Sequence, residues 1–165
     1  MEKNDLQFTN FKIHSQYSIC EGAVKVDELV QYCKNNKVKA IGLCDSLNLC
    51  GALEFSEKIS KVGTQPIIGS QINFKVEDIV GKIPIFAKTK EGYKNLTKLS
   101  SISYLESEAT SEPYCKLDNL LNNSKGLVVL SGTIYDLIGK LFKLNKINVI
   151  KNLIIKLNKT FDNNF

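Results

Sequence analysis

Three polar residues in the first half of the chain lie where short apolar runs end. His14 follows the alternating run FTNFKI, Asp45 follows AIGLC, and Gln71 lies within PIIGSQINF. In parallel α/β folds, functional side chains collect where strands end and loops begin. Lys12 and His14 are two residues apart, so on a strand they share a face. A His-x-His pair at this place would present two imidazoles to one metal ion, but a protonated Lys12 cannot act as a ligand.

The other residue types give little support to zinc or nucleophile chemistry. His14 is the only histidine, and the five cysteines contain no C-x-x-C pair, which argues against a zinc ribbon or knuckle. We expect the cysteines to be free thiols in a reducing compartment. Taken alone, His14 reads more readily as a half-buried structural histidine, and Asp45 as a turn or cap residue.

The apolar periodicity predicts the elements that must position these residues. Strands are expected at 8–14, 40–44, 66–74, 83–87 and 126–130. Helices are expected between them, one of them capped by Asn48, with further helical segments near 134–142 and 146–160. This alternation predicts an α/β fold with mainly parallel strands. The last helix has an apolar stripe of Ile147, Ile150, Ile154, Leu157 and Phe161, which we expect to be less buried than the helix face from Val26 to Cys33.

Composition and charge narrow the function classes. The chain has 165 residues, 43% of them hydrophobic, which suits one globular domain. It contains no apolar run of the roughly 18 residues that a membrane span needs, so a cytoplasmic protein is expected. All 22 basic residues are lysines, and the absence of Arg weakens any case for base-specific DNA reading. Lysines outnumber acidic residues in 137–165, and we expect them to form a solvent-exposed helix face. The alternative is a helix that binds the phosphates of nucleic acid.

A group of motifs carries a more specific indication. HSQYSICEG, CDSLNLCGALEF, PIIG, EGYKNLTKLSS and SKGLVVLSG occur in this order and spacing. Together they resemble the N-terminal PHP (polymerase and histidinol phosphatase) domain of bacterial DNA polymerase III alpha subunits. The resemblance implies a distorted barrel of β/α units, left incomplete here. It implies one domain over 1–165, truncated at its C-terminal side, with the polymerase domains absent.

The resemblance also implies where a metal pocket would lie. The family's metal-binding positions fall on six residues: Lys12, His14, Glu21, Asp45, Ser46 and Gln71. A lysine, a serine and a glutamine replace three of the expected ligands, and such groups cannot hold a multinuclear centre. We therefore expect a vestigial pocket with no catalytic residue and at most weak residual divalent-metal binding. We also expect the Lys12 ammonium to lie within about 4 Å of the Asp45 or Glu21 carboxylate.

The function implied by the resemblance is a non-catalytic scaffold and interaction domain in DNA replication. Its expected partners are the remainder of the polymerase chain, the proofreading exonuclease subunit as a further candidate, and DNA in the parent complex, with no membrane. The alternative is a metal-dependent PHP phosphoesterase or 3'-5' exonuclease.

Overall fold

The computed structural model describes residues 8–107 and 112–165, and it has an α/β architecture, as the alternation of apolar runs predicts. Strands β1 (Ala40–Ser46), β2 (Gln65–Val76), β3 (Ile79–Ala87) and β5 (Leu127–Val129) lie side by side in that order. The short strand β4 (Cys115–Lys116) pairs with β2 near its end. Among the described residues, no helix is long and apolar enough to span a membrane.

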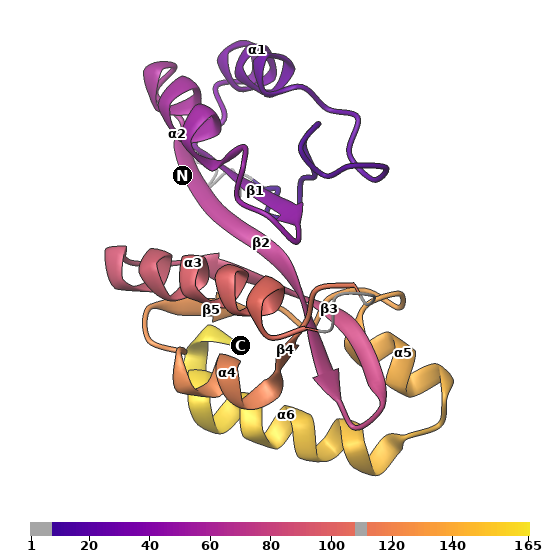
Figure 1. Cartoon of the computed structure of the whole chain (residues 1–165). Coiled ribbons are helices and arrows are strands. Elements are labelled where there is room, and N and C mark those ends of the chain that lie inside the picture. The colour runs from indigo at the N-terminus through magenta and orange to yellow at the C-terminus, as the bar shows by residue number, and fades with distance from the viewer. Residues whose placement is uncertain (1–7, 108–111) are drawn as a thin grey trace, which may run out of the picture.

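The sheet is mixed in direction. The pairs β1–β2 and β2–β4 are parallel, as expected, whereas β2–β3 and β3–β5 are antiparallel. The cause lies between β2 and β3, where only Glu77 and Asp78 separate the two strands. So short a connection can only reverse the chain, because a parallel return needs a crossover of a dozen or more residues. Strand β2 is long and curved, and it passes from the side of α1 and α2 to the side of α6 (Figure 1).

The strand predicted at 8–14 is not formed. This segment instead runs beside β1, where the Gly42 amide donates to the Asn10 carbonyl at 2.7 Å and the Cys44 amide to the Ile13 carbonyl at 2.8 Å. The approach needs a glycine, because a Cβ at position 42 would lie 2.3 Å from the Phe11 carbonyl oxygen. The segment therefore holds Lys12 and His14 close to β1 without joining the sheet as a strand.

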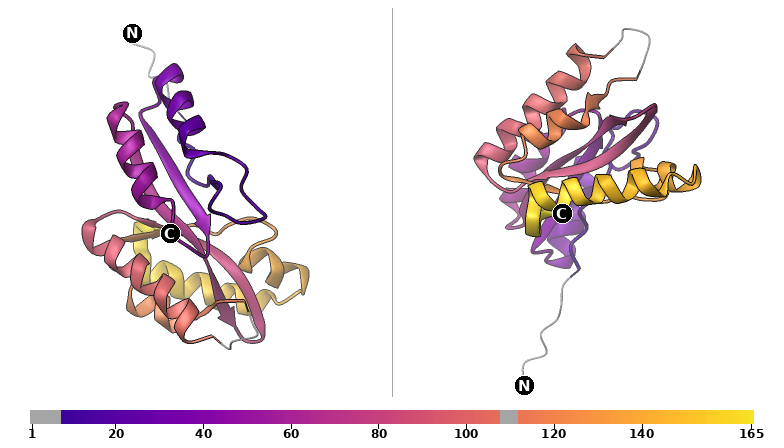
Figure 2. Two further views of the ribbon diagram at one scale, coloured as in Figure 1. Left: turned by 45° about the horizontal axis from the view of Figure 1, so that its top comes forward. Right: turned by 90° about the horizontal axis from the view of Figure 1, so that it is seen from below.

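Helices cover the sheet in two groups. Helices α1 (Val26–Asn36) and α2 (Ala52–Lys61) belong to the first half of the chain. The second half supplies α3 (Lys90–Leu105), α4 (Leu117–Asn122), α5 (Leu137–Lys143), α6 (Ile147–Phe161) and the 3-10 turn η1 (Asp162–Asn164), as two further views show (Figure 2). Helix α4 and strand β4 were not expected. Asn48 does not cap α2, since its side chain accepts from the Cys50 amide and donates to the Ser46 and Tyr17 carbonyls.

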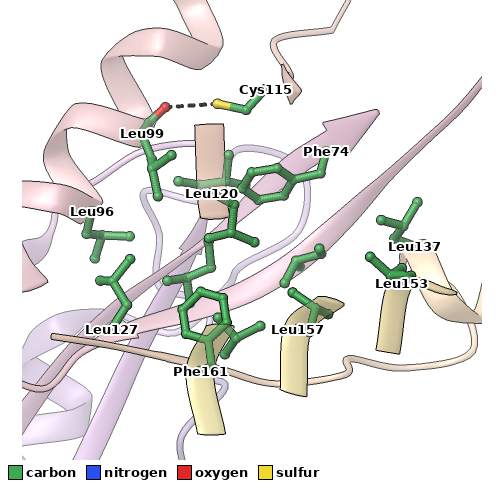
Figure 3. Close-up of a cluster of buried hydrophobic side chains, with 14 of the residues drawn as sticks. Phe74, Leu96, Leu99, Cys115, Leu120, Leu127, Leu137, Leu153, Leu157 and Phe161 are labelled. Atoms are coloured by element: carbon green, nitrogen blue, oxygen red, sulfur yellow. Dashed lines mark hydrogen bonds between the residues drawn. The ribbon is translucent and has the colours of Figure 1, made fainter. Parts of the chain in front are cut away.

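The buried apolar side chains form two clusters. The smaller lies between α1, α2 and β1, and includes Val26, Leu29, Cys33 and Phe55. The larger joins β2, β3 and β5 to the helices of the second half (Figure 3). In it, α6 buries Ile150, Leu153, Leu157 and Phe161, whereas Ile147 is 37% exposed and Ile154 only half-buried. The buried face of α6 is therefore rotated about the helix axis relative to the expected stripe, because Leu153 is buried where Ile154 was expected to be.

Candidate functional site

Side chains from three neighbouring strands share one face of the sheet. Ser46 of β1 and Gln71 of β2 are direct partners in the parallel register. Asn73 of β2 lies opposite Lys82 of β3 in the antiparallel register. Residues at aligned positions point the same way, and positions two apart on a strand share a face. The register thus gathers four polar side chains where β1 ends.

Strands β2 and β3 form one wall of a cleft of about 510 Å³. The other walls come from the segment before β1, the loop that contains Glu21, and the loop that leads into α5. The charged lining comprises three lysines and three carboxylates, and these are Lys12, Lys82, Lys140, Glu21, Glu112 and Asp136. The cleft is therefore polar but formally balanced in charge.

Lys12 pairs with Asp136, and not with Asp45 or Glu21 as we expected. Its Nζ lies 3.0 Å from Asp136 Oδ2, and the Asp136 side chain is only 5% exposed. The same carboxylate accepts from the Thr133 amide at 2.6 Å and from the Gln71 amide group at 3.3 Å. Burial alone would raise the pKa of Asp136, but the donors Thr133 and Lys12 outweigh it and lower that pKa below its ordinary value.

A second lysine, Lys82, neutralises Glu21. The Lys82 ammonium and the Ser46 hydroxyl both donate to the Glu21 carboxylate, one to each oxygen. Lys82 Nζ also lies 3.2 Å from Ser46 Oγ, which in turn lies 3.5 Å from Gln71 Oε1. Burial would raise the pKa of Glu21, but the bonds from Lys82 and Ser46 outweigh it and lower that pKa. A polar network of hydrogen bonds and close contacts therefore runs from Glu21 past Ser46 and Gln71 to Asp136, in which the Ser46 hydroxyl donates to Glu21 and only approaches the Gln71 oxygen.

Asp45 lies outside this network. It neighbours Ser46 on β1, so its side chain points to the opposite face of the sheet. The carboxylate is buried and accepts three hydrogen bonds, from the Ser15 amide at 2.7 Å, the Ser15 hydroxyl at 2.8 Å and the Ser18 hydroxyl at 2.7 Å. The Ser18 hydroxyl also accepts from the Ser46 amide at 3.0 Å. Asp45 thus fixes the loop that carries Glu21, which is a structural role.

His14 differs from the other predicted positions in the described part of the chain, because one of its ring nitrogens makes no hydrogen bond and could serve as a metal ligand. Its Nδ1 is buried and has no hydrogen-bond partner there. Burial lowers the pKa of His14, and the nearby Lys12 and Lys82 act in the same direction against the opposing effect of Glu21. His14 is therefore neutral near pH 7, because its pKa lies below the ordinary 6.5.

The six positions transferred from the resemblance are thus only partly brought together. Lys12, His14, Glu21 and Gln71 line the cleft, and the Ser46 hydroxyl donates to Glu21 and lies 3.5 Å from Gln71 Oε1, whereas Asp45 is turned away. Sequence reasoning missed Lys82, Asp136 and Thr133. The polar loop after the strand at 126–130 could have drawn attention to Asp136, but Lys82 enters the cleft only through the β2–β3 register.

The donors do not fit a multinuclear metal centre as they stand. In residues 8–107 and 112–165, no three His, Cys, Asp or Glu side chains lie where they could hold one metal ion. Glu21 and Asp136 each already bind a lysine ammonium, and Asp45 is occupied by two serines. A divalent cation would have to displace these cations, since like charges a few ångströms apart repel strongly.

Comparison with known proteins extends this description. Residues 10–165 match the family described as the PHP domain. DNA polymerase III subunit alpha of Borreliella burgdorferi is 36% identical over 170 aligned residues, covering 96% of this chain and 15% of that protein. The Caulobacter vibrioides subunit is 33% identical over 168 residues, covering 96% of this chain and 14% of its own length. A solved structure provisionally assigned as a metal-dependent phosphoesterase, from Bifidobacterium adolescentis, aligns over 60% of this chain and 35% of its own, with a TM-score of 0.45 and 16% identity.

Proposed function

The chain belongs to the PHP domain family and matches a short part of DNA polymerase III alpha subunits, and on this premise we propose that it is a non-catalytic scaffold and interaction domain of a replicative DNA polymerase. The proposal places the chain in DNA replication, in the cytoplasm. Its partners would be the remainder of the polymerase chain, the proofreading exonuclease subunit and DNA in the parent complex.

The observation that carries this proposal is the pair of lysines in the cleft. Lys12 binds Asp136, and Lys82 binds Glu21, so two of the three carboxylates that line the cleft are neutralised by a cation of the protein itself, and the third, Glu112, accepts from the Asn73 amide group at 3.3 Å. In an active metallophosphoesterase, divalent ions activate water and bind the phosphate. Lysine ammonium groups already balance the carboxylates of this cleft, so it has no excess negative charge that would attract divalent ions. The pocket is then a structural remnant that stabilises the fold.

The alternative is a metal-dependent PHP phosphoesterase or exonuclease. It is favoured by one feature, the buried and unpartnered Nδ1 of His14, which is a free nitrogen donor beside Glu21. A single imidazole and a lysine-bound carboxylate fall short of the three or more ligands that such chemistry requires. We therefore rank this reading second.

A manganese titration with a hydrolysis assay separates the two functions. We expect calorimetry to show no saturable Mn²⁺ binding by the 165-residue chain, and no metal-stimulated cleavage of bis(p-nitrophenyl) phosphate. The matched control is the variant Lys12→His/Ser46→His/Gln71→Glu, which restores the side chains implied at three positions and should gain Mn²⁺ affinity. Metal-dependent hydrolysis by the unaltered chain, abolished in His14→Ala, would establish the alternative instead.

A further inference from the structure

A second cleft lies at the opposite end of β2 from β1. It has a volume of about 370 Å³ and is formed by the end of β2, the start of α4 and one face of α6. These three segments lie near one another around the end of β2 (Figure 1). The cleft shares no lining residue with the first cleft, so it has no part in the polar network of Lys12 and Lys82.

The floor of this cleft is apolar and firmly supported. Leu153 is 2% exposed and belongs to the larger core cluster. Val76, Leu117 and Val149 are half-buried and pack against the same cluster (Figure 3 shows Leu153 within it). The floor therefore leaves a small aliphatic surface accessible and backed by the core, which suits an aliphatic side chain of a ligand.

The rim of the cleft is basic. Lys75, Lys116 and Lys156 come from β2, β4 and α6, and all three are exposed. In the described part of the chain, none of the three has a carboxylate within ion-pair distance, and the Lys75 ammonium lies 5.5 Å from the centre of the Tyr114 ring. Two carboxylates also line the cleft, but Glu77 is already bound by Lys146 at 2.6 Å, which leaves Asp118. The rim thus keeps a surplus of positive charge.

An aliphatic floor under a basic rim selects one class of ligand. We propose that this cleft docks an acidic peptide segment of a protein partner, with an aliphatic side chain of the peptide on Leu153 and Val149 and its carboxylates on Lys116 and Lys156. Single-stranded nucleic acid fits less well, because its binding sites combine lysines with aromatic stacking platforms. The described residues that line the cleft include no aromatic ring. The proposal does not depend on the polymerase assignment.

Fluorescence anisotropy tests this with the 165-residue chain and a labelled synthetic peptide in which leucines alternate with aspartate and glutamate. We expect saturable binding that weakens with salt, and about a tenfold loss of affinity in Lys116→Glu/Lys156→Glu. The matched control is Lys94→Glu/Lys98→Glu, which makes the same change in net charge on the exposed face of α3 and should leave the affinity within about twofold. The peptide with serine in place of leucine should bind at least about fivefold more weakly, since burial of an apolar leucine side chain contributes to the free energy of binding.

A second variant guards against a purely electrostatic effect. Asn152→Trp adds bulk at an exposed position on the cleft wall without altering charge. It should reduce peptide binding about as much as Lys116→Glu/Lys156→Glu does. The proposal is overturned if the peptide does not bind, or if both double variants lose affinity equally. It is also overturned if labelled oligo-dT binds more tightly than the peptide and loses affinity in Lys116→Glu/Lys156→Glu alone, which would assign the cleft to nucleic acid.

Discussion

Lys12 and Asp136 form an ion pair with a separation of 3.0 Å between Nζ and Oδ2, although 124 positions separate them in the chain. The pair joins the segment before β1 to the start of α5, so it closes one side of the first cleft. The lysine side chain is 27% exposed and the aspartate side chain 5%. An ion pair with one partner so deeply buried depends on both members, because a lone buried carboxylate is poorly solvated.

Replacing Lys12 with methionine should destabilise the domain. The change keeps most of the side-chain volume but leaves the Asp136 carboxylate without its cation, and we expect a loss of about 2 kcal/mol in the free energy of unfolding. Urea denaturation measures the loss. In the double variant Lys12→Met/Asp136→Asn, part of the stability should return. A cost for Lys12→Met that is the same in the Asp136→Asn background would contradict the coupling.

Removing both lysines of the first cleft should raise its affinity for divalent cations. In Lys12→Met/Lys82→Met, the carboxylates of Asp136 and Glu21 lose their protein cations, and the repulsion against an incoming metal ion disappears. Mn²⁺ titration followed by electron paramagnetic resonance should detect saturable binding by this variant, which the unaltered chain should not show. The control Lys94→Met/Lys98→Met changes the net charge equally. An equal gain in that control would show that net charge alone is responsible.

Acidification should destabilise the fold in two stages. His14 has a lowered pKa, so below its ordinary 6.5 the unfolded state binds a proton that the folded state does not, and stability falls with pH from there to the folded pKa. Asp136 and Glu21 also have lowered pKa values, so their contribution is complete above about 4.5 and is lost as pH falls through the folded values. Thermal melts between about pH 7.5 and about pH 3.5 measure both stages.

The His14→Gln variant separates these contributions. It should remove the upper stage of acid sensitivity and leave the lower one, since the carboxylates remain. A melting temperature that stays constant from neutral pH down to about pH 5 in the unaltered chain would contradict the burial of a neutral His14.

The Ser18→Ala substitution should loosen the loop that carries Glu21. The Ser18 hydroxyl donates to Asp45 and accepts from the Ser46 amide, and both groups would lose a partner. We expect a loss of about 1–3 kcal/mol in stability and faster proteolysis within the loop at 16–22. The matched control is Ser101→Ala on the exposed side of α3, where the hydroxyl, within residues 8–107 and 112–165, bonds only to the Thr97 carbonyl. Equal effects of the two substitutions would contradict the role assigned to Asp45.

The docking of α6 can be tested by truncating one buried and one exposed side chain. Leu157 is 1% exposed within the larger core cluster, whereas Ile155 is 63% exposed two positions earlier. Leu157→Ala should lower the free energy of unfolding by about 2–5 kcal/mol through the cavity it creates. Ile155→Ala should change it by less than about 0.5 kcal/mol. Denaturant unfolding measures both, and similar values would mean that α6 is not packed on the sheet in solution.

Much of the fold could be predicted from local patterns. The strands at 40–44, 66–74 and 83–87 and the helix face of Val26, Leu29 and Cys33 follow directly from apolar periodicity, and the structure extends the strands by only a few residues. The predicted strand at 8–14 was wrong because alternation indicates an extended chain but not a paired one. Here the segment accepts two backbone hydrogen bonds from β1, from the Gly42 and Cys44 amides, and forms no regular ladder.

The sequence by itself determined the α/β class and the family, because these depend on residue identity and order. Tertiary structure decided the ion-pair partners. Lys12 meets Asp136, and Lys82 meets Glu21, only because the β2–β3 hairpin and the loop before α5 bring distant segments to one cleft. A local pattern carries no information on such pairings, since charges interact according to distance in space and not along the chain.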